Sequence, residues 1–407
     1  MLAMGIRTFA LALAAFVGGT WTAGFPPTSA PEPQYQVEWR LSPRALAQAV
    51  PDPKINAFGL SPDGGTLALF VGSGYRAENI PAWLVLVSVA SGKILHKAEV
   101  GNLAPYWGFG ADWPPQILFT PDGERLIVQA LGRVAVMSAA TLRTERVLKG
   151  EPGSVAVSIC GSSGNGVVAV SFAKNWRKAQ PYTPLAVHVE MVDAANGVVE
   201  SSWEADDVPQ SLSPDGTLAA VSDHAAGSAS LPLAIVATNS GDTLAVLGTK
   251  YRFRKPRAGV NGVVVGQFLD DNRIVLGPDS GFDRSGRPSG RVLRIVDIRT
   301  GKVLQQIRPY RFGPTGEIAV ANRGAEIVTA SMQVPPGFYT HPHEVLPRDT
   351  VAKLLIFADR GGQFRPAGLL VPRAGVARIA GKALPFQVSA DGSTIAVGRT
   401  VFERSRR

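Results

Sequence analysis

The residue types best suited to metal or acid–base chemistry lie in two short segments that contain histidine. In His341-Pro342-His343-Glu344, an extended backbone would point both imidazoles to one side, as two of the ligands of a zinc site. Two ligands do not complete a site, and Pro342 can simply stiffen a loop. Asp223-His224 follows a predicted strand and resembles an acid–base pair, although adjacent residues seldom contact each other productively. The sequence therefore identifies no catalytic set, and we expect no resident metal or cofactor.

Other patterns also fall short of a chemical site. Gly161–Gly166 is glycine-rich, but it lacks the Gly-Lys-Ser/Thr ending of a phosphate loop, and a predicted strand follows in place of a helix. Asp279–Asp283 lacks the spacing of a calcium-binding EF-hand. The single cysteine, Cys160, excludes an intramolecular disulfide and lies in an apolar run, so we expect a buried thiol. His188 lies inside a predicted strand and is expected to be structural.

A repeated turn motif predicts the strands that would position any site. An apolar residue, Ser or Thr, Pro, Asp and Gly precede a short apolar run, which is typical of a tight hairpin. Proline presets φ, aspartate bonds to the local backbone and glycine accepts a positive φ. The near-copies are Leu60-Ser61-Pro62-Asp63-Gly64, Phe119-Thr120-Pro121-Asp122-Gly123, Leu212-Ser213-Pro214-Asp215-Gly216 and Val388-Ser389-Ala390-Asp391-Gly392.

Weaker turns complete the repeat. With them, turns fall near positions 64, 123, 164, 216, 271, 324 and 392, and the pattern predicts a four-stranded unit, with strands a to d, around each. All-β repeats of this length are typical of propeller blades. The last unit has too few residues for four strands, and Gln34–Leu41 is expected to complete it and close the ring. The expected fold is all-β: a single β-propeller of seven four-stranded blades.

These turns resemble those of WD40-like and YVTN-type propellers, with quinoprotein amine dehydrogenase heavy chains as distant relatives in architecture. The resemblance rests on the Ser-Pro-Asp-Gly turns and on Asp-x-x-Thr-Gly-Lys turns such as Asp297–Lys302. It covers residues 34–402 and implies the fold alone. The Trp-Asp and Gly-His dipeptides of standard WD40 repeats do not occur.

The N-terminus predicts export. Arg7 precedes the apolar run Thr8–Gly19, which is too short for an ordinary membrane-spanning helix, and a proline-rich stretch follows. We therefore divide the chain into residues 1–33, a signal peptide with its linker, and residues 34–407, the propeller. The expected location is periplasmic or extracellular, with an uncleaved anchor as the alternative. No later segment is apolar enough to cross a membrane.

Charge and loop composition suggest where a ligand would bind. The net charge is +9 and the isoelectric point is about 9.8, which favours anionic partners. In a propeller, the b–c and d–a connections share one face, and here they are long and rich in basic and aromatic residues. Such side chains suit anionic or planar ligands. The candidate binding residues are Tyr106, Trp107, Trp176, Arg177, Tyr251, Arg252, Arg254, Arg257, Arg284 and Arg287.

We therefore expect an exported, non-catalytic binding or assembly module that holds a protein partner, an anionic glycan or a small molecule. Nucleic acid is not expected, because the basic residues are spread over loops and form no known recognition motif. The alternative is a propeller enzyme, similar to lactonases, lyases or amine dehydrogenase subunits, with its site at the channel mouth. That alternative rests on analogy of fold.

Overall fold

The structure of the protein is a computed structural model whose chain divides into two units, Met1–Glu32 and Pro33–Arg407. All of the described residues belong to the second unit. They are residues 35–50, 53–72, 80–103, 115–130, 132–161, 164–174, 186–222, 230–231, 233–247, 262–263, 266–277, 292–307, 313–333, 351–370, 386–397 and 400–404.

The second unit contains seven four-stranded antiparallel sheets, which we call blades 1 to 7. Within each blade we name the strands a to d from the innermost outward. Blade 1 comprises β2 (Lys54–Leu60), β3 (Thr66–Gly72), β4 (Ile80–Ser88) and β5 (Ile94–Leu103). Blade 2 comprises β6 (Gln116–Phe119), β7 (Arg125–Ala130), β8 (Arg133–Ser138) and β9 (Thr144–Leu148). Blade 3 comprises β10 (Val155–Gly161), β11 (Val167–Ala173), β12 (Val187–Asp193) and β13 (Val199–Ala205).

The remaining blades repeat this order. Blade 4 comprises β14 (Pro209–Leu212), β15 (Leu218–Ser222), β17 (Leu233–Ala237) and β18 (Thr243–Leu247). Blade 5 comprises β20 (Gly266–Phe268), β21 (Arg273–Leu276), β22 (Leu293–Asp297) and β23 (Val303–Ile307). Blade 6 comprises β24 (Gly313–Ala321), β25 (Glu326–Gln333), β26 (Val351–Asp359) and β27 (Phe364–Leu370). Blade 7 comprises β28 (Phe386–Val388), β29 (Thr394–Val397), β30 (Thr400–Arg404) and β1 (Tyr35–Arg40).

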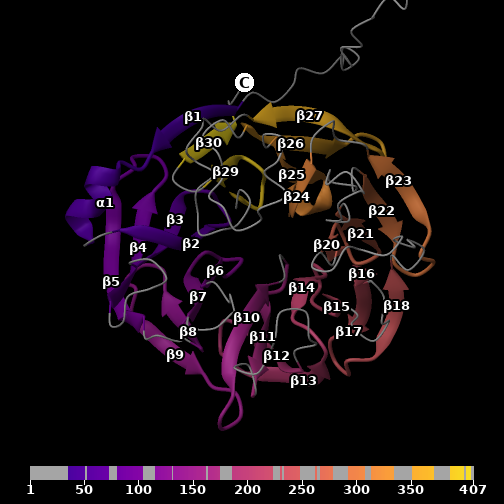
Figure 1. Ribbon diagram of the computed structural model, residues 1–407, viewed down its shortest axis with the longest axis horizontal. Coiled ribbons are helices and arrows are strands. Elements are labelled where there is room, and N and C mark those ends of the chain that lie inside the picture. The colour runs from indigo at the N-terminus through magenta and orange to yellow at the C-terminus, as the bar shows by residue number, and fades with distance from the viewer. Residues whose placement is uncertain are drawn as a thin grey trace, which may run out of the picture. The chain divides into compact units, whose positions relative to one another are not determined.

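Contacts between the innermost strands show that the blades close into a ring. β2 contacts β6, and the series continues through β10, β14, β20, β24 and β28, which contacts β2 again (Figure 1). In blade 7 the N-terminal strand β1 pairs with β30 from the C-terminus, with Tyr35 opposite Arg404. The predicted seven-bladed propeller, completed by the run Gln34–Leu41, is confirmed.

The b strands are mostly apolar because both faces of a blade are covered. In β3, Leu67 and Leu69 pack in a core cluster shared with blade 7, whereas Ala68 and Phe70 pack in a cluster shared with blade 2. Seven such clusters occur in the described residues, one between each pair of neighbouring blades. Alternate side chains of one strand thus hold two interfaces, which makes the blades interdependent.

The Ser/Thr-x-Asp-Gly turns are built from a repeated set of local hydrogen bonds. In blade 1, Ser61 Oγ donates to Asp63 Oδ1 at 2.5 Å, and the same oxygen accepts from the Gly65 amide at 2.9 Å. The Thr66 amide donates to Ser61 Oγ at 2.8 Å, which starts the b strand. Gly64 takes φ 72°, where a side chain would be strained. The turns at Asp122, Asp215 and Asp391 repeat these bonds.

Two features were not expected from the sequence. A short helix, α1 (Pro43–Ala49), follows β1; Ser42 caps it and its Leu46 packs in the cluster between blades 7 and 1. In blade 2, the c–d turn places Leu142 at φ 56° where other blades have glycine. Leu142 is 3% exposed, so burial of its side chain offsets the backbone strain.

Candidate functional site

The antiparallel strand order gives each blade two ends with different connections. The a–b and c–d turns lie at one end, and we call the face that they form the turn face. The b–c and d–a connections lie at the other end, and we call that face the loop face. This assignment follows from the strand pairing in all seven blades.

On the turn face, neighbouring a–b turns are joined by hydrogen bonds. The Asn322 amide donates to the carbonyl of Ala390 at 2.7 Å, and the Ala390 amide donates to the carbonyl of Pro62 at 2.9 Å. These bonds connect blades 6, 7 and 1. Blades 3, 4 and 5 are connected in the same way, through Asn165 Nδ2 with the Asp215 carbonyl and the Asp215 amide with Asp271 Oδ1. Polar groups of these turns are therefore used between the blades.

The ten candidate binding residues belong to connections of the loop face, and all ten lie outside the described residues. Tyr106 and Trp107 belong to the connection from β5 to β6, Trp176 and Arg177 to that from β11 to β12, Tyr251, Arg252, Arg254 and Arg257 to the segment after β18, and Arg284 and Arg287 to the connection from β21 to β22. Asp223-His224 and His341–Glu344 also lie outside the described residues.

Two connections of blade 4 pair with each other on the loop face. β16 (Ser230–Leu231), from the b–c connection, pairs in parallel with β19 (Gly262–Val263), from the d–a connection, with Ser230 opposite Gly262. The basic segment 248–261 is therefore bounded by the strand β18 on one side and by this pair on the other. Neither strand is long enough to be recognised in the sequence.

At the loop end of blade 3, the structure brings together a charged cluster that the sequence reasoning missed. His188 Nδ1 lies 2.8 Å from Glu204 Oε1 on the neighbouring strand, and His188 Nε2 lies 3.9 Å from Glu190 Oε1. The His188 side chain is 24% exposed, so the predicted structural histidine is partly accessible and paired. Nearby, Lys174 at the end of the b strand forms an ion pair with Glu151, just before the a strand.

The electrostatics of this cluster follow from its contacts. The pKa of Glu190 is raised, chiefly because burial disfavours its charge, while His188 acts in the opposite direction. The pKa of the exposed Glu151 is lowered, chiefly by its hydrogen bond with Lys174. The imidazole is thus held beside two carboxylates, whose oxygens can accept hydrogen bonds from a polar ligand group. The period-2 pattern Val187-His188-Val189-Glu190 indicates that His188 and Glu190 share a strand face, but only the register adds Glu204.

The other residues singled out from the sequence have no role in this cluster. His96 lies in β5, the outer strand of blade 1, and is exposed. Cys160 lies in β10, and burial raises the pKa of its thiol to about 12, so it is protonated at neutral pH. Gly161–Gly166 leads into the strand β11, as expected for a hairpin.

Comparison with solved structures identifies the fold. A chain in the crystal structure of the mitotic checkpoint complex matches with a TM-score of 0.52 and 11% sequence identity, covering 99% of this chain and 100% of that one. The fold is that of a WD40-like β-propeller. Hydrazine synthase of Kuenenia stuttgartiensis matches with a TM-score of 0.50 and 15% identity, covering 88% of this chain and 96% of that one. No family model and no curated protein matches the sequence.

The described residues contain neither a metal-ligand cluster nor a membrane-spanning helix. Among the described residues of the propeller, no group of three or more His, Cys, Asp or Glu side chains is placed to hold a metal ion. In the same part of the chain, no helix has the length and apolar character needed to cross a membrane.

Proposed function

We propose that this propeller is an exported, non-catalytic binding or assembly module whose loop face holds an anionic ligand or a partner protein. The observation that carries the proposal is the strand order: every connection that contains a candidate basic or aromatic residue joins strand ends of the loop face. Several groups of the a–b turns, in contrast, are engaged between blades, among them the Ala390 amide and the Asn165 and Asp271 side chains. Long connections on a rigid scaffold are the common place for binding residues.

The chemistry of the candidate residues favours anionic partners. Arginine offers a planar fork of donors to carboxylate, sulfate or phosphate groups, and it stacks on aromatic rings. Tyr251, Arg252, Arg254 and Arg257 fall within seven consecutive residues of the sequence, in the segment between β18 and β19. One solved structure with this fold comes from a protein complex, the mitotic checkpoint complex, which is in keeping with a protein partner.

Charge reversal tests the proposal. The tagged protein and a variant with Arg252, Arg254 and Arg257 changed to Glu are crosslinked in the cell envelope of the source organism and purified. We expect a stoichiometric partner, or binding to an acidic oligosaccharide, that is lost in the variant and weakens with salt in the native protein. The matched control changes Lys93, Arg143 and Lys302 to Glu, because these exposed residues lie in c–d turns of the turn face.

Each alternative has a distinct result. Equal binding by the native protein and the Arg252/Arg254/Arg257 variant would contradict the assignment of the basic segment. Turnover of a lactone or of an acidic oligosaccharide by the purified propeller would replace the binding role with the enzyme role. Export is tested separately: a reporter fused after residue 33 should appear outside the cytoplasm, and a fusion that lacks residues 1–33 should remain inside.

A further inference from the structure

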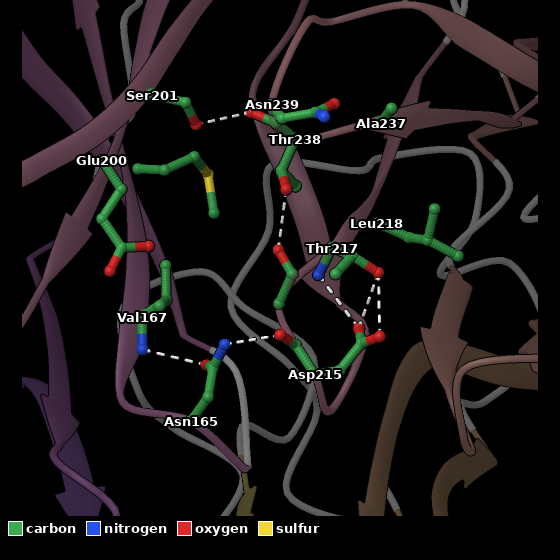
Figure 2. A pocket seen from close by; sticks show the side chains of 12 residues that line it. Asn165, Val167, Glu200, Ser201, Asp215, Thr217, Leu218, Ala237, Thr238 and Asn239 are labelled. Atoms are coloured by element: carbon green, nitrogen blue, oxygen red, sulfur yellow. Dashed lines mark hydrogen bonds between the residues drawn. The ribbon is translucent and has the colours of Figure 1, made fainter.

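A pocket between blades 3 and 4 opens among turn-face residues, away from the proposed loop-face site. Its volume is about 420 Å³, within the usual range of roughly 300–1,000 Å³ for ligand sites. Blade 3 contributes Glu200 from the outer strand β13 and Asn165 from its a–b turn, and blade 4 contributes Asp215 from its a–b turn (Figure 2). The pocket therefore lies across an interface between blades.

The charged groups of this pocket are acidic, although the whole chain is basic. Both titratable groups in the lining, Glu200 and Asp215, are carboxylates. Asp215 Oδ1 accepts bonds from Ser213 and Thr217, and Oδ2 accepts from Thr217 at 2.9 Å, which leaves Oδ2 with capacity for a further donor. No hydrogen bond or ion pair engages Glu200 within the described part of the chain, and its side chain is exposed. The pocket thus presents acceptors for a cation.

The rest of the lining is mixed: neutral polar residues such as Ser201 and Thr238 alternate with an apolar part. Val167, Met191 and Leu218 contribute to the wall, and Met191 is 1% exposed. Immediately before Glu200, Val198 and Val199 are 55% and 48% exposed. An apolar wall with acidic groups matches a long side chain that has a methylene stem and a charged end. These exposed valines, which precede Glu200 in the chain, favour a ligand carried on a peptide over a free ion.

We propose that this pocket between blades 3 and 4 binds an arginine side chain of a partner protein, with the stem against Val167 and Leu218 and the guanidinium between Glu200 and Asp215. Arginine is favoured over lysine because its planar fork of donors can serve acceptors from two blades at once. This site is independent of the loop face and takes the opposite charge. The protein would then hold two partners, or two parts of one partner, on its two faces.

Methionine methyl NMR provides a local readout, because the chain has five Met residues and Met191 lines the pocket. The probe is the peptide acetyl-Gly-Gly-Arg-Gly-Gly-amide, titrated into the full-length protein labelled with ¹³C at its methionine methyl groups, with Met191→Leu to assign the signal. We expect a saturable shift of the Met191 signal. The same peptide with citrulline, a neutral analogue of arginine, should cause none at equal concentration, and a lysine peptide should bind more weakly.

Glu200→Gln tests the role of the carboxylate. Because a hydrogen bond to a charged group contributes roughly 1.5–3 kcal/mol, we expect the affinity for the arginine peptide to fall roughly tenfold or more. Glu99→Gln, which makes the same charge change on the exposed outer strand of blade 1, should leave it unchanged. The proposal is overturned if the Met191 signal does not respond, if the citrulline peptide binds equally well, or if Glu200→Gln binds like the native protein.

Discussion

At the scale of single residues, the aspartates of the repeated turns connect the sequence motif to stability. The pKa of Asp63 and of Asp122 is lowered, chiefly by hydrogen bonds from Ser61 and Thr120. The pKa of Asp215 and of Asp391 is also lowered, although burial, the largest single influence, acts in the opposite direction. A lowered pKa in the folded state means that folding favours the ionised carboxylate.

We expect Asp63→Ala to lower the free energy of unfolding by about 1 kcal/mol at pH 7, since it removes bonds to Ser61 and Gly65 in a largely exposed turn. This contribution is fully present above the unfolded pKa of about 3.9 and is lost as pH falls through the lower folded value. Urea unfolding at pH 7, 5 and 3 should therefore show the two proteins converging in acid. Asp206→Ala, at an exposed position outside the turns, should have little effect; a constant difference at every pH would refute the explanation.

At the scale of elements, a buried ion pair joins blade 6 to the blade that contains both chain ends. Arg404 Nη2 of β30 lies 2.7 Å from Glu326 Oε1 of β25, and the Glu326 side chain is 5% exposed. The Arg404 guanidinium also lies 5.7 Å from the ring centre of Tyr35 in β1, whose hydroxyl donates to the Gly392 carbonyl. Burial is the main reason that the pKa of Tyr35 rises to about 12, so its phenol stays protonated.

We expect Arg404→Met to lower the free energy of unfolding by about 3 kcal/mol, because it leaves a buried carboxylate without its partner. The double variant Glu326→Leu/Arg404→Met should recover most of that loss, since neither charge remains. Thermal and urea unfolding of the two variants measure the difference. Arg365→Met, at an exposed position of β27, serves as the control. If the double variant is no more stable than Arg404→Met, the cost does not come from the unpaired charge.

At the scale of the whole molecule, the ring depends on one strand from the opposite end of the chain. β1 covers the edge of β30. The segment that follows β1 buries Leu41, Leu46 and Val50 between blades 7 and 1. Without them, blade 7 would keep three short strands and an open edge. Because every interface uses alternate residues of shared strands, the loss should spread to the neighbouring blades.

We expect deletion of residues 1–41 to abolish a stable monomer, with aggregation or loss of the cooperative unfolding transition. Deletion of residues 1–33 alone should leave the transition unchanged. Size-exclusion chromatography and calorimetry compare the two truncated proteins. A synthetic peptide of residues 34–41, the part of the propeller that this deletion removes, should restore the monomer of the longer deletion. Equal stability of both truncated proteins would show that the ring does not need β1.

The sequence by itself determined the number of blades and the path of the chain through them. A turn such as Ser61–Gly64 is specified by four consecutive residues whose backbone preferences and bonds are local, so its repetition could be counted without coordinates. Completion of blade 7 by Gln34–Leu41 also followed, because a three-stranded remainder needs a fourth strand.

Only the tertiary structure decided which distant side chains meet. The contact of His188 with Glu204 depends on the register of two strands. The ion pair of Glu326 with Arg404 depends on the packing of blade 6 against blade 7. The pocket that Glu200 and Asp215 line depends on how blades 3 and 4 pack against each other. Such contacts join residues from different strands, and no local preference encodes them. Leu142 shows the same limit: its turn conformation is unfavourable locally and is maintained by burial against the core.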